Sequence, residues 1–241
     1  YDSPANAFTT FARQFGGAYT SLNHSTFEGE FLWQDNENTF AAMTFLKDNN
    51  HIFTLPEFWD QSYASTPFVN QQTFITIGST AGVKYNVPTS GFEVGVAPIP
   101  YNADMPNQKA VIQQGTNVSM MQTGSDQEKL ASWLFLKYLI SKEVTTNWAM
   151  ATGYLPVRIS AYNSVEYQAF LNSTSTDART SAVIQAANAA EEQASYMFFD
   201  PAFIGSSRAR AYVGVALERI ILGDGNIQQA LDEAFNQANN G

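Results

Sequence analysis

The histidine and serine residues of this sequence are possible catalytic groups, since together they could form a nucleophilic site. The two histidines, His24 and His51, each lie in a polar segment that contains asparagine. Ser79 lies in the run Gly78-Ser79-Thr80-Ala81-Gly82, where it is second and not third, so the run does not match the nucleophile elbow of hydrolases. These residues do not favour a Ser–His hydrolase, and we expect both histidines at the surface.

Paired carboxylates are the second possible source of chemistry, because glycosidases use two of them. Glu28 and Glu30 are two residues apart, and Glu191 and Glu192 are adjacent. Neither pair lies in the apolar context that would raise the pKa of one carboxyl group. We interpret both pairs as solvated surface acids. No metal-binding motif or phosphate-binding P-loop motif is found, so we expect no enzyme, no catalytic residue, no metal and no cofactor.

Charge and composition narrow the classes of partner. The chain has 241 residues and a net charge of −10, with 12 basic and 22 acidic residues, and its densest basic patch is the pair Arg208 and Arg210. Nucleic-acid binding and adhesion to anionic lipid both need a positive face, so both are excluded. The chain has no cysteine, which excludes a disulfide scaffold and a thiolate zinc site.

The first residues, Tyr1-Asp2-Ser3, include no initiator methionine. We therefore expect this chain to be a fragment or a processed product, with any targeting signal or membrane anchor upstream.

The elements that must position functional residues are mostly helices. Apolar side chains at helical spacing, with capping residues such as Asn36 and Ser125, predict the main helices. They cover residues 5–15, 37–48, 125–139, 141–151, 206–222 and 227–238, with a weak helix in 59–68 and two more between 165 and 195. Short alternating runs predict strands at 73–77, 92–96 and 118–121. This mixture of strands and helices predicts an α/β fold.

Four segments, in this order and spacing, resemble the family-1 extracellular solute-binding proteins of ABC importers. The first runs from Phe68-Val69-Asn70-Gln71 to Gly78-Ser79-Thr80, although Gln71 stands where the family has glycine. The second, residues 94–104, resembles the family's Gly-Val-x-Pro-x-Pro segment. The third joins Gly115-Thr116-Asn117, two serial helices and the box Thr152-Gly153-Tyr154-Leu155-Pro156. The fourth is the final helix pair around Gly223.

This resemblance implies a periplasmic-binding-protein-like fold of two α/β lobes that close over a ligand. Residues 1–112 and 200–241 resemble most of the second, carboxy-terminal lobe, and residues 118–195 resemble a returning part of the first. Hinge crossings are expected near 111–117 and 196–205. Because closure needs contacts from both lobes, we expect a chain that lacks most of one lobe to bind its solute weakly or not at all.

Within the family, the glycerol-3-phosphate-binding subgroup is the nearest, because Pro100-Tyr101-Asn102-Ala103-Asp104 resembles its Pro-Tyr-Asp-Ala-Asp run. By order along the chain, the resemblance assigns ligand contacts to Ser79, Gly115, Tyr154 and Arg210. Weaker assignments fall on their neighbours Thr80, Asn117 and Arg208. Such a set suits a phosphate, since a guanidinium offers it paired donors and hydroxyl and backbone N–H groups complete the shell.

Three alternatives stay open from the sequence. An oligosaccharide-binding protein of the same family would rely on aromatic stacking and not on Arg210. A glycosidase would need a carboxyl group of raised pKa in a cleft. A surface adhesion protein would respond to no small molecule. The family reading further implies an ABC permease as partner, and a place in the periplasm or, as a lipoprotein, on the outer face of the cell membrane.

Overall fold

The computed structural model describes residues 1–223 and 225–240. They form two units. Unit 1 holds residues 1–78, 99–113 and the described residues from 194 onward, and unit 2 holds residues 79–98 and 114–193. No helix in the described part of the chain is long and apolar enough to cross a membrane.

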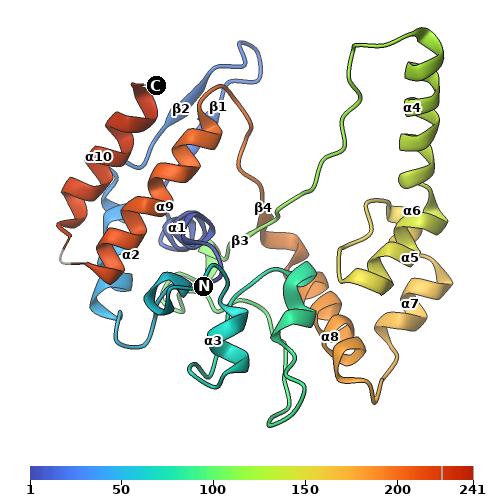
Figure 1. The fold of residues 1–241 in the computed structure, drawn as a ribbon. Coiled ribbons are helices and arrows are strands. Elements are labelled where there is room, and N and C mark those ends of the chain that lie inside the picture. The colour runs from blue at the N-terminus through green and yellow to red at the C-terminus, as the bar shows by residue number, and fades with distance from the viewer. Residues whose placement is uncertain (224, 241) are drawn as a thin grey trace. The chain divides into compact units, whose positions relative to one another are not determined.

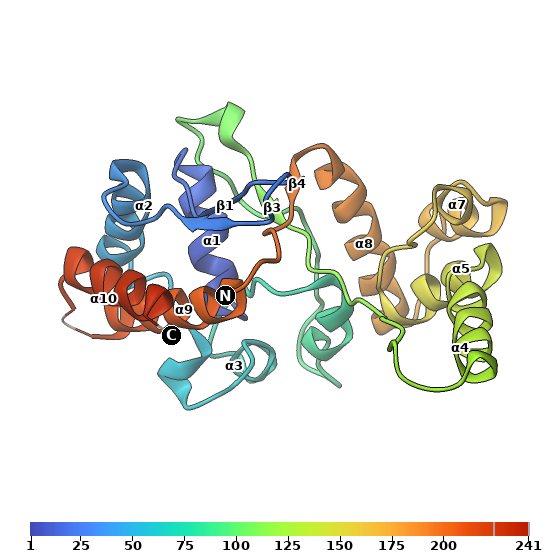
Figure 2. The same ribbon diagram turned by 90° about the horizontal axis from the view of Figure 1, so that it is seen from above.

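Unit 1 is built on four helices: α1 (Pro4–Gln14), α2 (Glu37–Asp48), α9 (Ser206–Leu222) and α10 (Ile227–Asn239). Figures 1 and 2 both show α9 and α10 side by side, and α1 packs on α2 and α9. The predicted helices are confirmed to within about one residue at each end. Asn36 caps α2 as expected, its Oδ1 accepting from the Thr39 N–H at 2.9 Å. Asp224, in the predicted break between α9 and α10, lies outside the described residues.

Short strands and turns complete unit 1. Strand β1 (Thr20–Leu22) pairs antiparallel with β2 (Gly29–Phe31), and β3 (Val111–Ile112) pairs parallel with β4 (Met197–Phe198). In place of the weak helix predicted in 59–68, the structure has two short pieces, the 3-10 helix η1 (Pro56–Trp59) and α3 (Ser65–Val69). Two further 3-10 turns are η3 (Pro106–Gln108) and η4 (Ala194–Tyr196).

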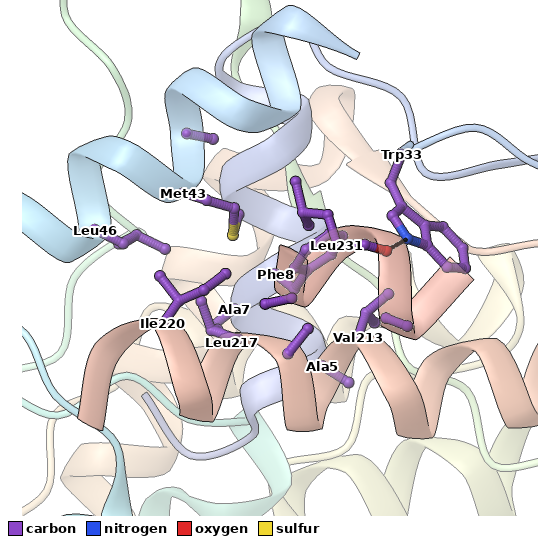
Figure 3. Close-up of a cluster of buried hydrophobic side chains, with 14 of the residues drawn as sticks. Ala5, Ala7, Phe8, Trp33, Met43, Leu46, Val213, Leu217, Ile220 and Leu231 are labelled. Atoms are coloured by element: carbon purple, nitrogen blue, oxygen red, sulfur yellow. Dashed lines mark hydrogen bonds between the residues drawn. The ribbon is translucent and has the colours of Figure 1, made fainter. Parts of the chain in front are cut away.

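The core of unit 1 lies between these four helices (Figure 3). Phe8, Met43, Leu217 and Ile220 are fully buried in it. Trp33 closes one end, where its indole N–H donates to the carbonyl oxygen of Leu231 at 3.2 Å. The core therefore fixes α1 against α9, the two helices that carry the charged residues described below.

Unit 2 is helical, with α4 (Asp126–Leu139), α5 (Lys142–Thr152), α6 (Ile159–Tyr162), α7 (Val165–Leu171), α8 (Ala178–Gln193) and the 3-10 helix η2 (Thr80–Asn86). The predicted capping box begins α4: Ser125 Oγ accepts from the Glu128 N–H at 3.3 Å, and a Glu128 carboxylate oxygen accepts from the Ser125 N–H at 2.7 Å. One cluster packs η2 on α8, and another packs α5 and α7 on α8.

The three predicted strands are wrong: residues 73–77, 92–96 and 118–121 form neither a strand nor a bridge. A strand is stable only when a neighbour takes up its backbone hydrogen bonds. In the described chain the only pairings are β1 with β2 and β3 with β4. The alternation of apolar and polar residues in these segments is compatible with a strand. It does not reveal whether a partner strand is present.

Residues 79–98 pack in unit 2 and not with residues 1–78. The reason is local packing. Val83 and Val87 are buried against Val183 of α8, and the Val96 N–H donates to Gln185 Oε1 at 2.9 Å. The chain passes between the units at residues 78–79, 98–99, 113–114 and 193–194. That these units correspond to the lobes of a two-lobe protein stays a prediction.

Candidate functional site

Arg210 lies on α9 of unit 1, on the side that faces α1. Its guanidinium donates a hydrogen bond to Asn6 Oδ1, and Nη1 lies 3.8 Å from Asp200 Oδ2. The side chain is 36% exposed. A guanidinium carries five N–H donors in a planar fork, so the contact with Asn6 leaves donors that can reach an anion from solvent.

A second arginine shares the same carboxylate. Arg13 Nη2 lies 3.6 Å from Asp200 Oδ1, and the Arg13 guanidinium carbon lies 4.3 Å from the centre of the Phe198 ring. Asp200 is largely buried, and burial raises its pKa, although the charges of Arg13 and Arg210 act to lower it. This group could not be predicted from the sequence, because Arg13 on α1 lies far along the chain from Asp200 and Arg210.

The predicted neighbour Arg208 has a structural contact. Its Nε donates to the carbonyl oxygen of Ala238 at 3.1 Å, near the carboxyl end of α10. Such a contact satisfies one of the carbonyl groups that the end of a helix leaves without an intrahelical partner. Arg208 therefore holds α10 against α9.

In unit 2, Ser79 and Thr80 lie at the start of η2. Ser79 is the residue before the first turn, and its Oγ accepts from the Gly82 N–H at 3.1 Å. Its side chain is exposed, and a hydroxyl that accepts one hydrogen bond can still donate its own proton. Ser79 therefore has a structural role and a free donor as well.

Tyr154 follows α5, where Gly153 ends the helix with φ of +88°. A Cβ on Gly153 would lie 2.6 Å from the Thr80 carbonyl oxygen, so this glycine permits the close approach of α5 to η2. Lys84 Nζ donates to the Ala151 carbonyl oxygen and ties the same two elements together. Unit 2 thus brings the predicted segments around Ser79 and Tyr154 together.

An exposed aromatic pair, missed by the sequence reasoning, lies at this place. The ring of Trp148 is 6.3 Å from the ring of Tyr154, centre to centre, and the two residues are 58% and 42% exposed. The sequence contained a signal for this pair, because Trp148 lies near the end of helix 141–151, shortly before Tyr154. It was not used, because an aromatic residue on a helix more often belongs to a core.

The structure describes no contact of Gly115 or Asn117 with the segments around Ser79 and Tyr154. Both are exposed in a segment without helix or strand. Apart from Gly115 itself and its two chain neighbours, no heavy atom lies within 4 Å of the position that a Cβ on Gly115 would take. Their assignment as ligand contacts stays a prediction.

The two glycines give a matched pair of substitutions. Gly153→Ala should lower the free energy of unfolding of the chain by about 1–3 kcal/mol, because alanine is strained at this φ and its Cβ would meet the Thr80 carbonyl. Gly115→Ala should change it by less than about 0.5 kcal/mol. Urea denaturation followed by circular dichroism measures both, and equal stabilities for the two variants would contradict the packing of η2 on α5.

The family is decided by a match to the whole amino-terminal part of the chain. Residues 1–172 match the family model described as bacterial extracellular solute-binding protein. The chain belongs to this family. Membership accounts for the four sequence segments noted above, three of which lie wholly within the matched residues.

Curated relatives in the same family are sn-glycerol-3-phosphate-binding periplasmic proteins. The UgpB protein of Yersinia pestis is 31% identical over 128 residues, which are 52% of this chain and 29% of the relative. The UgpB protein of Escherichia coli K12 is 28% identical over 219 residues, which are 84% of this chain and 48% of the relative. The chain therefore spans about half the length, or less, of the curated relatives it matches.

Solved structures show that the fold is that of two-lobe periplasmic binding proteins. UgpB from Mycobacterium tuberculosis in complex with glycerophosphocholine superposes with a TM-score of 0.67 at 18% identity, covering 97% of this chain and 54% of that one. The maltose-maltodextrin binding protein of Alicyclobacillus acidocaldarius gives 0.69 at 17% identity, covering 98% and 60%. The α/β two-lobe prediction is thereby confirmed.

Proposed function

We propose that this chain is part of the solute-binding component of an ABC importer, and that its solute is a small polyol phosphate such as glycerol 3-phosphate. The observation that carries the proposal is the partly exposed Arg210 guanidinium, hydrogen-bonded to Asn6, in a chain related to glycerol-3-phosphate-binding proteins. A phosphate ester is well matched by the planar donor fork of arginine.

The candidate residues divide between the units. Arg210 belongs to unit 1, whereas Ser79, Thr80, Gly115, Asn117 and Tyr154 belong to unit 2. We propose that the solute is captured by lobe closure, which its higher affinity for the closed state would drive. We propose that the closed form is then presented to a membrane permease, with the protein held in the periplasm or at the outer face of the cell membrane.

A thermal-shift screen of the protein, as its gene encodes it, tests this proposal. A solute at 100 times its dissociation constant stabilises the folded state by about 2.7 kcal/mol, enough to raise Tm by several degrees. We expect a rise with glycerol 3-phosphate or glycerophosphocholine, and none with glycerol. No rise with any phosphorylated polyol would contradict the choice of solute.

A second candidate solute is an oligosaccharide, favoured by the exposed pair Trp148 and Tyr154. Aromatic faces of this kind can stack on apolar sugar faces, and solved maltose-binding proteins share the fold. A rise in Tm with maltose or maltotriose alone in the same screen would select this candidate. In either case we propose that there is no turnover, and release of nitrophenol from aryl glycosides would contradict that.

A further inference from the structure

Arg210 is one of three charged side chains that lie close together in unit 1. The Arg13–Asp200–Arg210 triad, as we name it, comes from α1, from the segment after β4 and from α9. The two arginines approach different oxygens of one carboxylate, at 3.6 Å and 3.8 Å. With Asp200 ionised, the triad carries one surplus positive charge.

The triad is poorly arranged for stability alone. The Asp200 oxygens are buried, and their contacts with Arg13 and Arg210, at 3.6 Å and 3.8 Å, are longer than a well-formed charge-assisted hydrogen bond. Burying a carboxylate costs several kcal/mol unless close, well-aligned donors compensate. The surface pair Arg219 and Glu233, on α9 and α10, is in contrast directly hydrogen-bonded. An unfavourable buried charge kept next to a candidate ligand residue points to a role in binding.

A further polar atom lies in this neighbourhood without a partner. The hydroxyl of Tyr19, a residue only 3% exposed, has no hydrogen bond in the structure. Burial raises the pKa of Tyr19, as does the charge of Asp200, whereas Arg210 lowers it. The hydroxyl therefore stays protonated near neutral pH and keeps a proton to donate.

We propose that Arg13 is a positioning residue that keeps Arg210 available to an anionic group of the solute by sharing Asp200 with it. If Asp200 faced Arg210 alone, the two would form a neutral pair, and an arriving anion would have to compete with the carboxylate. Because Arg13 takes the other oxygen, the triad keeps a net positive charge beside the Asn6-bound guanidinium. This inference rests on the proposed function and adds to it a positioning role for Arg13, which acts on the phosphate site through Asp200.

A double-mutant cycle at Arg13 and Asp200 tests the inference. Affinities for glycerol 3-phosphate and for inorganic phosphate are measured by calorimetry for R13Q, D200N and R13Q/D200N in the protein as its gene encodes it. We expect R13Q to bind about tenfold more weakly, since Asp200 then neutralises Arg210. We expect D200N to bind at least as tightly as the unaltered protein, and the double variant to recover most of what R13Q loses.

Conservative and distant variants provide the controls. R13K keeps the positive charge beside Asp200 and should retain affinity within about threefold. R219Q/E233Q, which removes the surface pair in the same unit, should leave the affinity unchanged. Melting temperatures show that each variant is folded during the titration. A merely structural role for Arg13 would change Tm without reversing the sign of the effect on affinity between R13Q and D200N.

Three outcomes would overturn the inference: unchanged affinity in R13Q, weakened binding in D200N, or no recovery in the double variant. Failure of the proposed function would look different. If the unaltered protein binds neither phosphate compound, the proposed phosphate solute is contradicted, and a rise in Tm with sugars in the screen above would still support a solute-binding role.

Discussion

Replacing Arg210 with glutamine should weaken the binding of glycerol 3-phosphate by roughly a hundredfold or more, equivalent to about 2.7 kcal/mol. Glutamine cannot offer the paired charged donors of a guanidinium, and a phosphate left without a cation loses its charge-assisted hydrogen bonds. Calorimetric titration of R210Q and the unaltered protein measures this difference directly.

The variant R210K separates charge from geometry. Lysine keeps the positive charge but donates from a single point, so we expect an affinity between those of the unaltered protein and R210Q. R179A serves as the control, because Arg179 is an exposed arginine at the start of α8 in unit 2. Equal affinity of R210Q and R179A for glycerol 3-phosphate would show that Arg210 does not contact the solute.

Replacing Trp33 with alanine should cost about 3–5 kcal/mol of folding free energy, a large part of the stability of an ordinary domain. Trp33 is fully buried and stacks on Tyr19 with ring centres 5.5 Å apart. The substitution would leave a cavity and would remove the hydrogen bond that the indole N–H donates to the Leu231 carbonyl oxygen. Urea denaturation followed by circular dichroism provides the measurement.

The matched control for Trp33→Ala is Phe74→Ala in the same unit. Phe74 is fully exposed, so removing its ring should change the free energy of unfolding by less than about 0.5 kcal/mol. A Trp33→Ala protein that unfolds at the same urea concentration as the unaltered protein would contradict the packing of the core around α9 and α10.

Helices could be predicted from the sequence because their signals are local. The capping box at Ser125 and Glu128, the cap at Asn36 and the apolar stripe of residues 206–222 each lie within a few residues of the element they specify. Strands could not be predicted in the same way, since their hydrogen bonds depend on a partner that no local pattern reveals.

The residues of the candidate site differ in the same way: some lie in local motifs, and others meet only through tertiary packing. Family motifs pointed to Ser79, Tyr154 and Arg210, because these residues lie in recognisable local segments. Arg13 and Asp200 could not be found, since they meet only after α1, β4 and α9 have packed. The bond from Arg208 to the Ala238 carbonyl was likewise invisible, although it distinguishes Arg208 from Arg210.

The most direct test of the proposed role is a calorimetric titration of the protein, as its gene encodes it, with glycerol 3-phosphate and with maltose. We predict saturable one-to-one binding of glycerol 3-phosphate, with a dissociation constant of roughly micromolar or below, equivalent to about 8 kcal/mol or more, and no heat with maltose. Saturable binding of maltose without any response to glycerol 3-phosphate would contradict the anionic solute, and silence with both would contradict the account of Arg210 as a phosphate ligand.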